Sequence, residues 1–194
     1  MDISELIDRK TGERKYLNRD ERAAFFEATR YMEPDIKFFA RMIYYTGCRP
    51  GEALEVTPDK LDYQEKGVVI RTLKQNPDKP RFRFLELPES FLETLHDVYS
   101  IQDKQGDKAG KSRIWSFTDR TGRNYIKAVM DKAGITGIKA SAKGLRHSMG
   151  VMLALDKVPI HIIQQILGHR SINNTRIYAQ VVGDERRGMI SRVW

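Results

Sequence analysis

Cationic side chains between residues 141 and 178 are spaced so that they could act together on a phosphate. Ser141 is suited to be a helix N-cap, because its hydroxyl can accept hydrogen bonds from the free amides of the first turn. Lys143 and Arg146 then lie three positions apart on one face of that helix. Two cations at the positive end of a helix repel each other, whereas an anion held between them would be stabilised. The pattern therefore indicates an anion-binding helix terminus.

A second helix and the turn after it extend this stretch. Pro159 begins an apolar run at helical spacing, and Gly168 is expected to end that helix in the left-handed conformation. His169 would then lie in a turn, where its imidazole can point at a ligand. Tyr178 falls about two turns into the helix that follows.

These residue types suit the cleavage of a phosphodiester. That reaction needs a nucleophile, stabilisation of a highly charged transition state, and a proton for the departing oxygen. Many nucleases use two metal ions held by carboxylates. The sequence has no tight Asp/Glu cluster and no His/Cys spacing typical of a metal site, so we expect neither a metal nor another cofactor. Arginine instead supplies a planar fork that matches phosphate oxygens and keeps its charge.

Composition sets the broad class of the protein. The chain has 194 residues and a net charge of +8, from 34 Lys and Arg against 26 Asp and Glu. This balance favours a polyanionic partner, although basic globular proteins without one are common. The single cysteine excludes an internal disulfide, no apolar run approaches the ~20 residues that span a bilayer, and the N-terminus lacks a signal-peptide pattern. We expect a soluble, cytoplasmic protein.

A second cationic position lies earlier in the chain. Gly47 is expected to end one helix and Pro50 to begin the next, which holds Arg49 at a helix entrance. Glu52 is one turn further and could grip the guanidinium. Taken alone, this pattern favours an ordinary surface ion pair worth less than about 1 kcal/mol over a functional site. The adjacent Cys48 is interpreted as a small core residue, because no phosphate-cradling loop accompanies it.

Between these two positions the sequence predicts a β-hairpin and further helices. Residues 67–73 and 81–87 are rich in β-formers, and the second run alternates charged and apolar residues, which indicates one solvent-facing side. Lys74 lies at the end of the first strand and Lys79 beyond the turn, and either could be an ordinary loop residue. Helices are expected at 88–103 and 124–132.

Together these motifs resemble the catalytic core of the tyrosine recombinases, the phage-integrase family. The likeness is carried by Ser-x-Lys-x-Leu-Arg-His, by Leu-Gly-His with a tyrosine nine residues after its histidine, and by Gly-x-Arg-x-x-Glu-x-Leu. It implies a mainly α fold with a small antiparallel β-sheet (α+β) over residues 17–182. Residues 1–16 are then an arm or linker. Residues 183–194 form a tail that contacts a neighbouring protomer or packs on its own domain.

The resemblance also implies a role for each residue of the core. Tyr178 would attack the scissile phosphate, form a 3′-phosphotyrosyl link and release a 5′-hydroxyl. Arg49 and Arg146 would bind the non-bridging oxygens, and Glu52 would orient Arg49. Lys74 would protonate the leaving 5′ oxygen.

Other positions follow from the same likeness. His169 would hydrogen-bond the phosphate, and Arg170 would contact DNA beside the two active-site arginines. Lys143 departs from the family, in which a histidine most often stands there and serves as the candidate base. A lysine ammonium donates well but is a poor base, so the group that accepts the tyrosine proton is left open. His147 is expected to face a different side of its helix in a structural role.

The implied partner is double-stranded DNA at a specific site. Self-association on DNA into a tetrameric synapse and accessory DNA-bending proteins are also implied, and no membrane is. Such a protein would act in the cytoplasm at the nucleoid, encoded by a bacterium, phage or plasmid. Two alternatives stay open, a catalytically weak DNA-binding relative and a type IB topoisomerase. The chain is either a minimal recombinase or a fragment without the N-terminal domain that clamps DNA.

Overall fold

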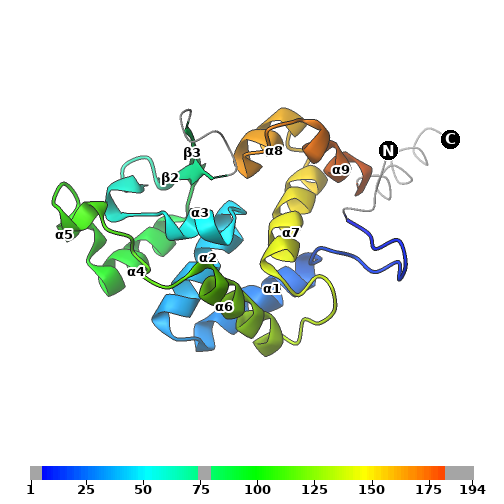
Figure 1. The fold of residues 1–194 in the computed structure, drawn as a ribbon, viewed down its shortest axis with the longest axis horizontal. Coiled ribbons are helices and arrows are strands. Elements are labelled where there is room, and N and C mark those ends of the chain that lie inside the picture. The colour runs from blue at the N-terminus through cyan, green and yellow to red at the C-terminus, as the bar shows by residue number, and fades with distance from the viewer. Residues whose placement is uncertain (1–5, 74–79, 182–194) are drawn as a thin grey trace.

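The fold is mainly helical with one small antiparallel sheet, which confirms the predicted class (Figure 1). The computed structural model describes residues 6–73 and 80–181. Its helices are α1 (Arg19–Ala28), α2 (Pro34–Thr46), α3 (Pro50–Leu54), α4 (Glu89–Tyr99), α5 (Ile101–Lys104), α6 (Asp119–Lys132), α7 (Ala142–Leu155), α8 (Ile160–Leu167) and α9 (Asn173–Val181). Its strands are β1 (Leu61–Asp62), β2 (Gly67–Thr72) and β3 (Arg81–Glu86).

The predicted hairpin is formed by β2 and β3. The sheet order is β1-β2-β3 with antiparallel neighbours, and Val68 lies opposite Leu85. The segment that connects β2 to β3 carries Lys74 and Lys79 and lies outside the described residues. None of the helices within the two described ranges is long and apolar enough to cross a membrane.

Local capping sets the ends of the helices that hold the site. Ser141 Oγ accepts from the Gly144 amide at 3.1 Å and so starts α7, as predicted. Gly47 and Gly168 adopt φ values of 61° and 63° and end α2 and α8. The left-handed conformation of each glycine ends the helix and sets the direction of the chain that carries Arg49 or His169.

Two predicted helix boundaries are wrong. The helix expected at 88–103 is divided because Ser100 takes a left-handed φ of 50° between α4 and α5. The helix expected at 124–132 begins earlier, at Asp119, since the Thr118 hydroxyl accepts from the Thr121 amide and caps it.

Two hydrophobic clusters support the site. The larger one joins α1, α2, α6 and the sheet around buried aromatic rings that include Phe25, Phe39 and Trp115. The smaller one joins α7, α8 and α9 around Val151 and Leu167. Figure 1 shows α7 beside α2, with α8 and α9 at its far end and β3 next to α8. The junction of the two clusters therefore brings together the two halves of the motif set.

Candidate active site

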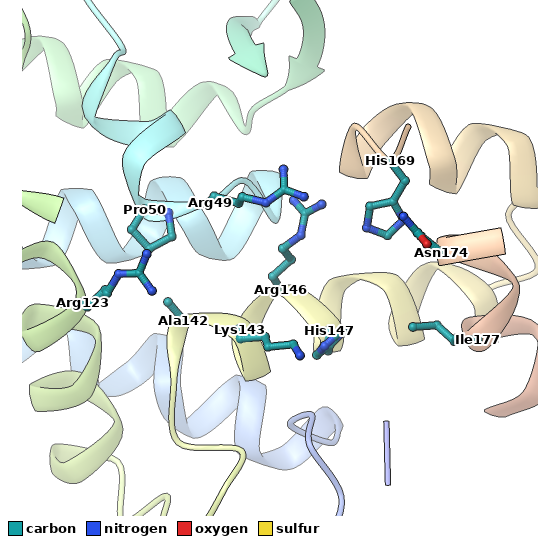
Figure 2. Close-up of a pocket in the computed structure, with 10 residues that line it drawn as sticks. All are labelled: Arg49, Pro50, Arg123, Ala142, Lys143, Arg146, His147, His169, Asn174 and Ile177. Carbon is teal, nitrogen blue, oxygen red and sulfur yellow. The ribbon is translucent and has the colours of Figure 1, made fainter. Parts of the chain in front are cut away.

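A cavity of 430 Å³ lies at this junction, and Arg49, Lys143, Arg146 and His169 of the predicted site line it, whereas Tyr178 is buried beside it. Figure 2 shows the guanidiniums of Arg49 and Arg146 next to each other, with the His169 ring facing them. Arg49 immediately precedes α3, Arg146 lies in α7 and His169 in the turn after α8, so tertiary packing brings them together. The full lining is Arg49, Pro50, Arg123, Ala142, Lys143, Arg146, His147, His169, Asn174 and Ile177.

Glu52 fixes Arg49 from inside the protein. Arg49 Nη1 donates to Glu52 Oε1 at 2.8 Å, and the Arg49 backbone N–H donates to Glu52 Oε2 at 3.1 Å. Glu52 is only 1% exposed, so the pair is not an ordinary surface ion pair. Burial alone would raise the pKa of Glu52, but Arg83 and Arg49 lower it below its ordinary value. The carboxylate therefore stays ionised and keeps its salt bridges to Arg49 and Arg83.

Arg83 is a member of this network that the sequence did not reveal. From β3 it donates through Nη2 to Glu52 Oε2 at 2.7 Å, through Nη1 to Thr72 Oγ1 at 2.7 Å, and through Nε to the Ile166 carbonyl at 2.9 Å. One side chain thus joins the sheet, α3 and the end of α8. The expectation that the charged residues of this strand face solvent is wrong for Arg83.

Replacing Arg83 with methionine is expected to lower the free energy of unfolding by about 3 kcal/mol. The change removes three hydrogen bonds and leaves the buried Glu52 carboxylate with one fewer cation. Urea denaturation followed by circular dichroism measures it. Arg81→Met, on the same strand but exposed, is the matched control and should shift stability by less than about 0.5 kcal/mol. Equal losses in both variants would contradict the role given to Arg83.

Arg146 is held by the ends of two helices. Nη1 donates to the Gly47 carbonyl at 2.7 Å and Nη2 donates to the Leu167 carbonyl. These carbonyls end α2 and α8, where the partial charge of a helix is negative, so both stabilise the guanidinium. Burial, with Arg49 nearby, lowers the pKa of Arg146 to about 10, which still leaves it charged at pH 7. The fork is therefore fixed at the cavity before any ligand binds.

His169 is oriented by a buried threonine. Its Nδ1 lies 2.9 Å from Oγ1 of Thr175, which is fully buried. When the Thr175 hydroxyl donates to Nδ1, the proton of the ring lies on Nε2, which can donate to a phosphate. Burial, followed by Arg146 and Arg49, lowers the pKa of His169 to about 3, so the ring is neutral at pH 7. Thr175 lies between the Leu-Gly-His motif and Tyr178, but its position alone predicted no contact with His169.

Tyr178 reaches the site from α9 of the same chain. It is 1% exposed, and its hydroxyl lies 3.0 Å from Nδ1 of His147. Its ring stacks on that of His169, with centroids 6.3 Å apart and planes 13° apart. A Cβ at Gly150 would lie 2.4 Å from the phenol ring, so only glycine leaves room for it. The phenol is therefore clamped between α7 and the turn after α8.

The remaining predicted residues differ in their placement. Lys143 lines the cavity, and so does His147, contrary to the expectation that His147 faces a different side (Figure 2). Arg170 is exposed and does not line the cavity. Lys74 lies outside the described residues. Arg123 of α6 lines the cavity instead, although nothing in the sequence singled it out.

Lowering the pH from about 6.5 to about 4 is expected to destabilise the fold, because His147 is buried as a neutral imidazole. Burial, with Lys143 and Arg146 nearby, lowers the pKa of His147 from 6.5 to about 4. The unfolded chain then binds more protons between these values, so this stability is present above pH 6.5 and is lost as the pH falls toward about 4. His147 alone contributes on the order of 3 kcal/mol to that loss.

Urea denaturation between about pH 7 and about pH 4 measures this effect. His147→Asn should flatten the slope, because asparagine does not titrate. His161→Asn changes an exposed histidine of α8 and should keep the wild-type slope. An unchanged slope in His147→Asn would contradict the burial of a neutral imidazole.

Comparisons with known proteins agree with the fold and the motifs. The profile of the phage integrase family matches residues 15–184, and the chain belongs to this family. It is 28% identical over 176 residues to a resolvase of Escherichia coli. The alignment covers 76% of this chain and 68% of the resolvase. The chain is 26% identical over 155 residues to tyrosine recombinase XerA of Thermococcus onnurineus, with 75% of this chain and 51% of the relative covered.

Solved structures give the same result. A crystal structure of XerA recombinase superposes with a TM-score of 0.72 at 25% identity, over 91% of this chain and 62% of that one. The catalytic domain of bacteriophage HP1 integrase superposes with a TM-score of 0.63 at 18% identity, over 86% of this chain and 87% of that domain. The XerH recombinase bound to its difH substrate gives 0.70 at 23% identity, with 84% of this chain and 50% of XerH covered. The chain thus spans about half to two thirds of these longer recombinases.

Proposed function

We propose that this chain is a site-specific DNA recombinase that cuts and rejoins strands through Tyr178, without ATP. The observation that carries the proposal is convergence: two fixed guanidiniums and a neutral imidazole line one cavity, and the buried phenol of Tyr178 contacts His147 and His169, which also line it. Family membership supports it, because the relatives include proteins named resolvase, integrase and tyrosine recombinase.

The charges of the cavity suit a phosphate in its transition state. Arg49 and Arg146 would bind the non-bridging oxygens, and His169 would donate Nε2–H to one of them. Because Glu52 and the helix-end carbonyls fix the guanidiniums beforehand, little reorganisation is needed when charge builds up on phosphorus. Arg123, from α6, would hold a flanking phosphate.

Strand exchange follows from the chemistry of the intermediate. Attack by Tyr178 would link its oxygen to phosphorus and release a 5′-hydroxyl, with Lys74 as the proposed donor of the proton. The phosphotyrosyl bond keeps the phosphorus activated, so a second 5′-hydroxyl can reverse the attack. Since α9 packs on α7 of the same chain, each protomer would cut with its own tyrosine.

The wider assembly belongs to the proposal as well. The partner would be double-stranded DNA, in agreement with XerH, which was solved bound to difH. A tetrameric synapse, accessory DNA-bending proteins and action in the cytoplasm are inferred from the resemblance. Residues 17–182 would be the catalytic domain and residues 183–194 a protomer contact.

A nicked duplex tests the proposal. Duplexes taken from the DNA that flanks the coding region are nicked beside each candidate cleavage position, so that the short 5′-hydroxyl product diffuses away and the intermediate is trapped. A protein–DNA adduct on a denaturing gel, formed with magnesium chelated, is the expected result. Relaxation of supercoiled plasmid without any preferred site would instead indicate a topoisomerase and would overturn the assignment.

A further inference from the structure

We infer that His147 accepts the proton of Tyr178 during strand cleavage; this inference rests on the proposed recombinase chemistry. Its Nδ1 lies 3.0 Å from the phenol oxygen, a distance at which a proton can pass directly. Nε2 of the same ring is buried and has no hydrogen-bond partner among the described residues. Nδ1 is therefore the nitrogen of His147 that could accept the proton of the Tyr178 hydroxyl.

The neighbouring groups are less suited to this step. Lysine holds its proton until about pH 10 in water, so Lys143 is better suited to donate. His169 lies nearly parallel to the Tyr178 ring, and its Nδ1 is engaged by Thr175, so its nitrogens are not aimed at the phenol. His147 meets the phenol oxygen through Nδ1 instead.

The surroundings keep His147 ready to accept. Burial and the nearby cations lower its pKa to about 4, so the imidazole is neutral at pH 7. A phosphate bound at Arg49 and Arg146 would add negative charge and make protonation of the ring easier. The groups that face His147 come from every element around it, and they are Lys143, Arg146, Lys15, Tyr178 and His169.

The step balances without a co-reactant. The Tyr178 O–H bond breaks as its oxygen bonds to phosphorus, and the proton moves to His147 Nδ1. The bond between phosphorus and the 5′ oxygen breaks, and that oxygen takes a proton from the cationic donor proposed above. In the reverse reaction His147 returns the proton to the phenol.

Single-turnover cleavage of the nicked duplex as a function of pH tests the inference. The wild-type rate should be flat from about pH 5 to about pH 9 and fall as the pH approaches about 4, where His147 is protonated. His147→Asn keeps a polar atom near Nδ1 but cannot accept the proton. Its rate at pH 7 should be about 10²–10³-fold lower and should rise about tenfold per pH unit, as the phenol ionises into water. His161→Asn is the matched control and should follow the wild type.

A second substrate separates this role from others. A duplex with sulfur in place of the bridging 5′ oxygen has a leaving group that needs no acid. The defect of His147→Asn should persist on it, whereas that of Lys74→Ala should largely disappear. A uniform, pH-independent loss in His147→Asn would show a merely structural role, and recovery on the sulfur substrate would place His147 on the leaving group. Either result overturns the inference.

The wild-type profile is informative even if His147→Asn fails to fold. A wild-type rate that climbs steadily to pH 9 would mean that the phenol ionises unaided, which also overturns the inference. Absence of any wild-type adduct is a different result, since it removes the proposed function itself.

Discussion

Tyr178→Phe is expected to abolish the covalent adduct, with cleavage reduced by about 10⁴-fold or more. Phenylalanine fills the same space between Gly150 and His169 but has no oxygen to attack phosphorus. DNA binding should change by less than about twofold, because the hydroxyl is buried against His147 and contributes no charge to the cavity. Loss of the hydrogen bond to His147 should lower the stability by about 1 kcal/mol.

Gel shift and the trapped-adduct assay, run on the same duplex, measure both effects. Tyr31→Phe is the matched control, since Tyr31 is 76% exposed and does not line the cavity. It should cleave like the wild type. An adduct that survives in Tyr178→Phe would show that another residue is the nucleophile.

Arg146→Ala should lower the cleavage rate by about 10²–10³-fold while DNA affinity falls far less. The guanidinium is held by the Gly47 and Leu167 carbonyls before DNA arrives, so its main effect is on charge that develops in the transition state. Arg146→Lys keeps the charge but loses the fork. It should therefore bind DNA nearly normally and still cleave slowly.

The same two assays decide this prediction. Arg30→Ala removes an exposed arginine that does not line the cavity, and it should cleave at the wild-type rate. Equal losses of binding and cleavage in Arg146→Ala would mean that this arginine only anchors DNA. Thermal melting checks that both variants are folded at the assay temperature.

The features that could be predicted from the sequence, the helix caps and ends and the hairpin, each depend on residues close together in the chain. The Ser141 cap and the glycine stops at 47 and 168 depend on hydrogen bonds over three or four positions. The placement of Arg49 and His169 at the cavity, and of Glu52 behind Arg49, follows from these local stops once the fold is given. The hairpin was predictable for the same reason, because strand composition is local.

The parts that were missed depend on partners far along the chain. Arg83 meets the Ile166 carbonyl 83 residues away, and His147 meets Tyr178 31 residues away. The alternation in β3 was recognised, but the expectation that its charged residues face solvent is wrong for Arg83. Arg83 shares a face with the buried Leu85, whereas Phe82 on the opposite face is 54% exposed. The apolar pattern shifts by one residue within the strand, so polarity alone could not give the buried side.

Identification of the linked atoms is the most direct test that these side chains converge on one phosphorus. The trapped adduct is digested with trypsin and nuclease, and the modified peptide is sequenced by mass spectrometry while the released DNA end is labelled. The expected result is a nucleotide joined through its 3′-phosphate to Tyr178, with a 5′-hydroxyl on the other strand end. A link to any other residue, a 5′-phosphotyrosyl bond, or free ends produced by hydrolysis would contradict it.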